Sequence, residues 1–359
     1  MKKNRFKNTD SISDFICRKK DHISLSLKEE NEALGFSGFS LIQLVHSALP
    51  EMDFSEVDIS THFFEKKLAT PFVVTGMTGG WEGSLEINKR IARLCEKKGW
   101  IMGAGSQRRQ ISDSDAGREW QEISKECPHL TLIGNIGLSQ LIQMKLSKME
   151  ELVSSLKASA MVVHTNPLQE ALQLEGTPQF KGGLNALCDL CKNLSVPVIL
   201  KETGCGFSQN QLQDLSGIGL FAVDLSGYGG THWGRIEGNR IDKKHFLYGI
   251  AETFKDWGIS TVDSLLFAKK VNKDYEIWAS GGVRNGCDAA KALALGANRV
   301  GVARPIIQSA LKGVVTLEQT MSRLEYELRV ALFCSGCKSI EAIKKHKNIW
   351  KWKNSLFNG

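Results

Sequence analysis

From residue 70 onward, short apolar runs alternate with longer stretches in which apolar residues recur every three or four positions. Short runs without polar residues are typical of parallel strands that are buried on both faces. The longer stretches, including residues 85–97, 139–158 and 286–295, have the spacing of amphipathic helices. Eight apolar runs predict strands at residues 71–75, 100–103, 130–133, 161–163, 197–200, 220–224, 276–279 and 299–302.

Eight strands alternating with helices predict an α/β fold, the closed (β/α)8 TIM barrel. A doubly wound open sheet is the alternative, but no G-x-G-x-x-G motif opens a helix after an early strand. Two regions fall outside the repeat. Residues 1–69 form an N-terminal arm, with short helices expected around residues 40–49, and residues 232–268 enlarge the loop after strand six. The predicted organisation is therefore an arm (1–69), a barrel (70–335) and a basic C-terminal tail (336–359).

Charge and composition narrow the function classes. The net charge of +7 is concentrated at the ends, with four positive charges in the first seven residues and six lysines in residues 338–353. Solvated tails explain this pattern, and attraction of phosphates is the functional alternative. The folded region has no basic helix or aromatic–basic motif, so we expect no nucleic-acid partner.

Membrane insertion and secretion are not expected either. No run of about 18 apolar residues occurs, which argues against a membrane span. The basic N-terminus is not followed by an apolar segment, so a secretory signal is not expected. The nine cysteines are scattered and odd in number. They are typical of reduced thiols, which predicts a cytoplasmic protein.

Candidate chemistry gathers where the predicted strands end, which is where barrel enzymes build their active sites. Every strand end carries glycine or a polar side chain. Glycine permits close approach of a ligand to the backbone, although strand–helix loops also need glycine for turns. Its presence around the whole rim favours a large bound cofactor. Gly281-Gly282 and Ala303-Arg304-Pro305 follow strands seven and eight, the usual phosphate site of such barrels.

Residues 164–170 combine an imidazole, two amides and a carboxylate at the end of strand four and in the following turn. Glu170 is the metal candidate, because one carboxylate with phosphate oxygens and waters is a usual way to hold Mg²⁺. Capping of a helix N-terminus is the alternative role for Glu170. Nearby, Ser106 and Arg108 offer a hydroxyl and a bidentate fork to a phosphate.

Two cationic features have both a functional and a structural interpretation. Lys201 ends an apolar strand and is predicted to project into the barrel mouth, beside a flavin or a phosphate. An ion pair with Glu202 or Asp224 is the structural alternative. Arg18, Lys19 and His22 form a cationic group on the arm, which spacing alone identifies as a solvated charge run.

These motifs together resemble those of the type 2, FMN-dependent isopentenyl-diphosphate isomerases, over residues 14–335. The H-x-N-P-x-Q-E heptad and the M-T-G-G motif are the most specific. The resemblance is carried by residues 18–22, 48–50, 77–80, 105–108, 164–170, 226–233 and 280–286. His232, a bulky ring inside the G-G-T-x-W pattern, leaves a change of pocket shape open.

The resemblance implies a barrel with FMN in its mouth and conversion of isopentenyl diphosphate to dimethylallyl diphosphate. It also implies Mg²⁺, reduction of FMN by NADPH, reduced FMN as the acid–base group, and a homo-tetramer or homo-octamer. FMN would contact Met77, Thr78, Gly79, Ser106, Asn135, Lys201, Ser226, Thr231, Gly281, Gly282, Ala303 and Arg304. The diphosphate would contact Arg18, Lys19, His22, Ser106, Arg108, His164, Asn166 and Gln169, with Glu170 on Mg²⁺. His164 and Gln169 are the candidate catalytic side chains.

Two other functions are alternatives to this one. An FMN-dependent 2-hydroxy-acid oxidase or dehydrogenase would share the fold and the phosphate loops, but it needs a histidine base beside an arginine. The strand-six loop, Ser226-Gly227-Tyr228-Gly229-Gly230, contains no such pair. A non-catalytic flavin-binding barrel is the other rival. The presence of Arg108, His164, Gln169 and Glu170 argues against it.

Overall fold

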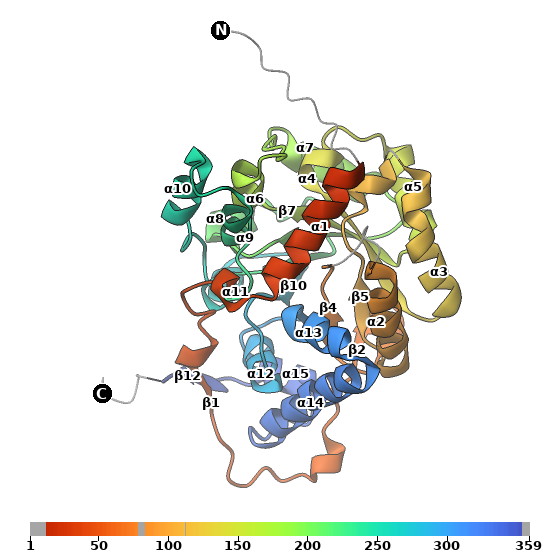
Figure 1. Ribbon diagram of the computed structural model, residues 1–359. Coiled ribbons are helices and arrows are strands. Elements are labelled where there is room, and N and C mark those ends of the chain that lie inside the picture. Colours follow the sequence, from red (N-terminus) through yellow and green to blue (C-terminus); the bar gives the residue numbers. More distant parts are fainter. Residues whose placement is uncertain (1–11, 78–82, 112, 354–359) are drawn as a thin grey trace.

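Eight parallel strands close into a barrel at the centre of the molecule, as the sequence predicts (Figure 1). The computed structural model describes residues 12–77, 83–111 and 113–353. The barrel strands are β4 (Phe72–Val74), β5 (Ile101–Gly103), β6 (Thr131–Gly137), β7 (Ala160–Thr165), β8 (Val198–Glu202), β9 (Ala222–Asp224), β10 (Glu276–Ala279) and β11 (Arg299–Val302). They follow one another in sequence order, and β11 pairs with β4 to close the ring.

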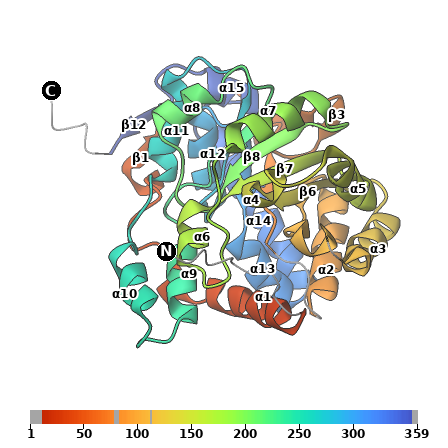
Figure 2. The same cartoon turned by 90° about the horizontal axis from the view of Figure 1, so that it is seen from above.

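Helices surround the barrel and cover its outer face (Figures 1 and 2). They are α2 (Ser84–Lys98), α3 (Arg118–Glu126), α4 (Leu138–Leu141), α5 (Leu146–Leu156), α6 (Pro167–Leu172), α7 (Gly183–Asn193), α8 (Gln209–Asp214), α11 (Thr261–Lys270), α12 (Gly286–Ala294), α13 (Arg304–Lys312) and α14 (Val314–Phe333). In α2, Ile87, Ile91 and Leu94 recur on one face and are buried. The helix ends at Gly99, whose left-handed backbone (φ 66°) lets its N–H bond the last carbonyls.

The N-terminal arm and the enlarged loop after strand six meet at the barrel mouth. The described part of the arm begins with α1 (Ile12–Ser26), and the loop contains α9 (Trp233–Arg240) and α10 (Phe246–Thr253). Both views show α1, in red, beside α9 (Figures 1 and 2). Two regions about 200 residues apart in sequence therefore form one wall.

Two predicted helical segments differ from the structure. Residues 139–158 form two helices, α4 and α5, so that Leu141 and Met149 can both reach the core across the intervening turn. Residues 40–49 contain a 3-10 turn, Phe39–Leu41, and a strand, β1 (Ile42–Leu44), instead of helices. The reason is long-range pairing, because β1 lies antiparallel to β12 (Trp350–Trp352) and Ile42 is fully buried.

The other end of the barrel is closed by a hairpin of the arm, β2 (Thr61–Phe63) and β3 (Lys66–Leu68). Phe63 packs against Trp278 and Phe221 among the inward-facing residues of the strands. The basic C-terminal region is not simply a solvated tail, since α15 (Ile340–Lys345) and β12 bury Ile343 and Ile349. Within the described ranges, no helix is long and apolar enough to cross a membrane.

Candidate active site

The C-terminal ends of the strands enclose a cavity of about 530 Å³, within the range typical of ligand sites. Thr78 and Gly79 lie outside the described residues. The cavity brings together the other predicted site residues: Arg18, Lys19, His22, Met77, Ser106, Arg108, Asn135, His164, Asn166, Gln169, Glu170, Lys201, Ser226, Thr231, Gly281, Gly282, Ala303 and Arg304. Their individual roles stay predictions.

The arm contributes a buried cationic wall. Arg18 and His22 lie one turn apart on α1 and are 4% and 7% exposed, so they are not part of a solvated charge run. Burial, with the neighbouring charges of Arg18 and Arg108, lowers the pKa of Lys19 to about 8, although Glu237 opposes the shift. Crowded cations of this kind favour a multiply charged anion.

His22 does not share that charge. Burial lowers its pKa despite the hydrogen bond to Glu237, so the ring is neutral near pH 7. Its Nε2 lies 2.8 Å from Glu237 Oε1 and donates to that carboxylate, and its ring meets Trp233 edge-on at 5.2 Å between centroids. The expected three-residue cationic group is therefore reduced to Arg18 and Lys19.

His164 is a neutral imidazole held in one tautomer. Asn135 Nδ2 donates to the Ala104 carbonyl at 3.0 Å, which turns its Oδ1 toward His164 Nδ1, 2.8 Å away. Nδ1 therefore carries the proton and Nε2 has a lone pair. Burial and the charges of Lys19, Lys201 and Arg108 lower the pKa of His164 to about 3. In this tautomer Nε2 of His164 can accept a hydrogen bond but cannot donate one to an anion, and the neutral ring adds no positive charge.

The carboxylate of Glu170 is buried and oriented by the loop that follows α6. Oε2 accepts hydrogen bonds from the Thr177 N–H at 2.6 Å and the Thr177 hydroxyl at 3.3 Å. Asn166 Nδ2 donates to Gln169 Oε1 at 2.9 Å and reaches Glu170 Oε1 at 3.4 Å. These bonds go to the Thr177 loop and to the side chain of Asn166, the N-cap of α6, and Glu170 itself lies in the first turn of that helix. The metal role and the helix-terminal role of Glu170 both stay predictions. Among the described residues no group of three His, Cys, Asp or Glu could hold a metal.

Lys201 makes one of the ion pairs expected as its structural alternative, and it also lines the cavity. Its Nζ lies 3.3 Å from Asp224 Oδ2 and donates to the Glu202 carbonyl at 2.8 Å, while the side chain lines the cavity. Glu202 is not its ion-pair partner, because that carboxylate accepts the N–H groups of Gly204 and Gly206 instead. Asp224 also accepts the Ser280 hydroxyl at 2.6 Å.

The loops after β10 and β11 form the cationic end of the cavity. Arg284 and Arg304 both pair with Glu32 of the arm, and Arg304 also donates to the Leu27 carbonyl. Gly281 and Gly282 have positive φ values of 94° and 74°. A Cβ at Gly281 would lie 2.1 Å from the Gly227 carbonyl oxygen. These glycines are therefore required first by loop packing, and only then by any ligand.

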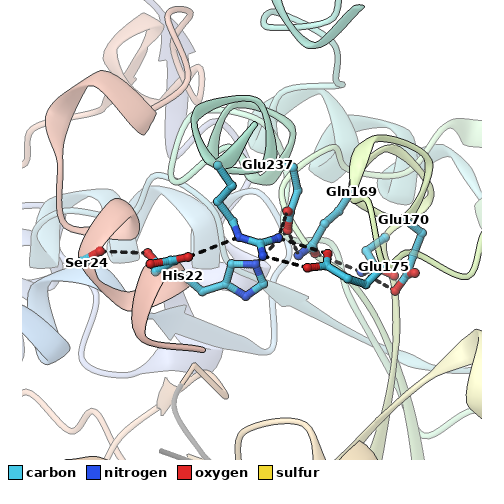
Figure 3. Close-up of polar contacts among 9 residues, drawn as sticks. His22, Ser24, Gln169, Glu170, Glu175 and Glu237 are labelled. Atoms are coloured by element: carbon cyan, nitrogen blue, oxygen red, sulfur yellow. Dashed lines mark hydrogen bonds and ion pairs between the residues drawn. The ribbon is translucent and has the colours of Figure 1, made fainter. Parts of the chain in front are cut away.

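His232 does not line the cavity; it is fully buried and caps α9. Its Nε2 donates to the Trp257 carbonyl at 3.1 Å, and its Nδ1 accepts the Arg235 N–H at 3.2 Å. Sequence reasoning missed Glu237, whose carboxylate contacts His22 and Gln169 from the enlarged loop (Figure 3), and Arg240, which pairs with Glu237. Their i, i+3 spacing on α9 is the one local signal that they act together.

Known proteins resemble the chain over almost its whole length. A model of the FMN-dependent dehydrogenase family matches residues 134–351. An isopentenyl-diphosphate delta-isomerase of Bdellovibrio bacteriovorus is 47% identical over 344 residues, covering 95% of this chain and 99% of the relative. One of Legionella pneumophila is 46% identical over 336 residues, covering 94% and 98%.

Solved structures of flavoenzymes share the fold at much lower identity. A flavocytochrome b2 with sulfite bound has a TM-score of 0.64 at 20% identity, covering 95% of this chain and 84% of that one. A mandelate oxidase with 2-hydroxy-phenylacetamide has a TM-score of 0.61 at 17% identity, covering 95% and 98%. Identity this low shows the barrel architecture alone. The relatives that match over almost their whole length, at 47% and 46% identity, show the family. The chain therefore belongs to the type 2, FMN-dependent isopentenyl-diphosphate delta-isomerase family.

Proposed function

We propose that the protein interconverts isopentenyl diphosphate and dimethylallyl diphosphate in isoprenoid biosynthesis, with reduced FMN and Mg²⁺. The observation that carries this proposal is the convergence of the arm residues Arg18 and Lys19, Arg108 and the 164–170 heptad on one cavity. The full-length relatives named isopentenyl-diphosphate delta-isomerase support the substrate.

The donor set of the cavity fits FMN. Ser106, Asn135, Lys201, Ser226 and Thr231 offer polar groups along its lining, and Arg284 and Arg304 supply cations beside the Gly281-Gly282 loop. A planar ring system with a phosphate at one end needs this distribution of donors. When bound in its reduced form, FMN would supply acid–base chemistry at its ring nitrogens and an electron-rich face. We expect NADPH to be the reductant.

The donor set also fits a diphosphate with Mg²⁺. Arg18, Lys19 and Arg108 would bind phosphate oxygens, and the amides of Asn166 and Gln169 would donate hydrogen bonds to them. His164 would contact the diphosphate by accepting a hydrogen bond at Nε2 from a protonated phosphate oxygen or a bound water. Glu170 would hold Mg²⁺ through a carboxylate that Thr177 already orients, and phosphate oxygens and waters would complete the coordination. A single carboxylate suffices for Mg²⁺ only if the substrate supplies further oxygens.

The chain's own residues would bind and orient the alkene rather than protonate it. His22 and His164 are neutral, and His164 has its one ring proton on Nδ1, bonded to Asn135. With α1 along one wall, the arm would exclude water from a carbocation-like transition state. Binding of the diphosphate at a distance from the double bond would position it for proton transfer.

A hydroxy-acid oxidase is the second candidate, favoured by the match to the FMN-dependent dehydrogenase family. Its histidine base has no counterpart in the strand-six loop, and His232 two residues later is fully buried as a helix cap. A flavin-binding barrel without catalysis would bind FMN and turn nothing over. We further propose that the protein is cytoplasmic, which its nine free cysteines support. We also propose that it assembles as a homo-tetramer or homo-octamer.

Anaerobic turnover of isopentenyl diphosphate with Mg²⁺ and chemically reduced FMN tests the proposal. Dimethylallyl diphosphate should form in the complete mixture and not when Mg²⁺ or the reductant is omitted. Absence of product from protein that binds and reduces FMN would reject the isomerase. Oxidation of a 2-hydroxy acid by the same preparation would then identify the oxidase, and no turnover at all would identify the non-catalytic barrel.

A further inference from the structure

Arg240, at the end of α9, is a largely buried charge that contacts three parts of the molecule without lining the cavity. Its side chain is 12% exposed. Nη1 donates to Glu237 Oε2 at 2.6 Å, and Nη2 donates to Glu175 Oε1 at 3.1 Å. Nε lies 3.8 Å from Asp21 Oδ2 of α1. One guanidinium thus joins the arm, α9 and the loop after α6.

The contact with Glu237 leads to the substrate side of the site. Glu237 Oε1 accepts hydrogen bonds from His22 Nε2 at 2.8 Å and Gln169 Nε2 at 2.9 Å. Its carboxylate is 1% exposed, so its charge depends on Arg240 and these donors. Burial opposes ionisation, but His22, Arg240 and Gln169 together keep the pKa of Glu237 below its usual range. Loss of Arg240 would leave an uncompensated carboxylate behind both predicted diphosphate ligands.

The contact with Glu175 leads to the predicted metal side. Glu175 lies in the loop that carries Thr177, whose N–H and hydroxyl orient Glu170 Oε2. This loop folds tightly against α6, since a Cβ at Gly176 would lie 2.1 Å from the Glu170 carbonyl oxygen. Arg240 therefore holds the loop from one side while Glu170 holds it from the other.

We propose that Arg240 is a positioning residue that couples the substrate ligands His22 and Gln169 to the Mg²⁺ carboxylate Glu170. The inference rests on the proposed function of this site. It requires the planar fork of arginine, because one guanidinium bonds two carboxylates in different directions. A lysine ammonium would bring the charge to the same place without that geometry.

The test compares Arg240→Gln, Arg240→Lys and Glu175→Gln with wild type, and with Arg93→Gln as a matched control. Arg93 is 53% exposed and pairs with Glu126 on the outer helices. The first readout is binding of inorganic diphosphate to the FMN-loaded protein by calorimetry, with and without Mg²⁺. The second is the Mg²⁺ and substrate dependence of turnover, separated into KM and kcat. FMN affinity is measured by spectral titration.

Arg240→Gln should weaken Mg²⁺-dependent diphosphate binding by about 10–100-fold while FMN affinity stays unchanged, as for loss of an orienting contact. Arg240→Lys should recover only part of this loss. Glu175→Gln should raise the Mg²⁺ requirement and leave Mg²⁺-free diphosphate binding as in wild type, because the Glu237 contact remains. Arg93→Gln should match wild type throughout.

Wild-type Mg²⁺ and diphosphate affinities in both Arg240→Gln and Glu175→Gln would overturn the inference. Equal losses of FMN and diphosphate binding in Glu175→Gln and Arg240→Lys would also overturn it, since that pattern reports general loss of structure. If wild type fails to isomerise isopentenyl diphosphate, the proposed function falls. The calorimetric comparison would still decide whether Arg240 couples the two ligand groups.

Discussion

The two ends of the barrel are formed by the same strands but differ in the side chains that point inward. Toward the hairpin end, Ile133, Val162 and Ile199 form an apolar layer that Phe63 closes. At the mouth, two residues later on the same strands, stand Asn135, His164 and Lys201. Because successive side chains alternate between faces, residues two apart both point inward. One strand thus contributes a stabilising residue and a functional residue in consecutive layers.

This difference indicates that the hairpin end stabilises the fold, whereas the mouth contains buried polar groups that lower its stability. The lower layer buries apolar surface and fills the barrel. The mouth buries groups whose charges or lone pairs require partners, including Lys201 with Asp224 and Glu237 with Arg240. Substitutions at the two ends should therefore separate into effects on unfolding and effects on ligands.

Phe63→Ala, at the hairpin end of the barrel, should have the largest effect, a loss of stability. Phe63 is 2% exposed, and truncating a buried phenylalanine lowers the free energy of unfolding by about 3–5 kcal/mol. Denaturant unfolding measures this loss, with Phe64→Ala as control because Phe64 is 47% exposed. Equal losses in the two variants would contradict the assignment of Phe63 as the closing residue. The folded Phe63→Ala protein should retain wild-type KM.

Glu170→Gln, at the barrel mouth, should reduce turnover rather than stability. The amide keeps the size of the side chain but removes the charge that would hold Mg²⁺, so turnover should fall by about 10²–10³-fold. The thermal midpoint should change little. Steady-state kinetics across Mg²⁺ concentrations provide the measurement, and Glu151→Gln, an exposed carboxylate, is the control. Turnover equal to wild type would remove Glu170 as the metal ligand.

Low pH should reveal how the neutral His164 at the mouth lowers the stability of the folded protein. The pKa of His164 is lowered from 6.5 to about 3 by burial and neighbouring cations. Between these values the unfolded chain binds a proton at His164 that the folded protein does not, so stability falls as pH decreases through the window. His164→Gln should show a shallower decrease in unfolding midpoint between neutral pH and the middle of that window. An unchanged slope would contradict the burial of a neutral imidazole.

Alkaline pH should give the smallest effect, on substrate binding. The pKa of Lys19 is lowered to about 8 by burial and by Arg18 and Arg108, so its charge is lost as pH rises through that value. KM for isopentenyl diphosphate should then increase by about ten-fold, the contribution of one charge-assisted hydrogen bond. Lys19→Met should have a raised KM that no longer changes there. The control is Lys20→Met, at the exposed neighbouring position, which should show the wild-type pH dependence of KM.

Much of this protein could be predicted from local patterns. Apolar runs located all eight strands, and their ends located the cavity residues, because strand period and chain direction are local properties that a closed barrel then brings to one rim. The 164–170 heptad could be recognised because its polar residues directly follow an apolar strand.

Only the tertiary structure decided which distant groups meet. Residues 40–49 appeared helical, yet Ile42 pairs with Trp352. The arm cluster appeared solvated, yet α1 lies on α9 and buries Arg18 and His22. Burial then made His22 and His164 neutral, and Arg240 found partners at positions 21, 175 and 237. Side-chain charge, burial and ion pairing depend on neighbours far apart in the chain, and local sequence does not contain those neighbours.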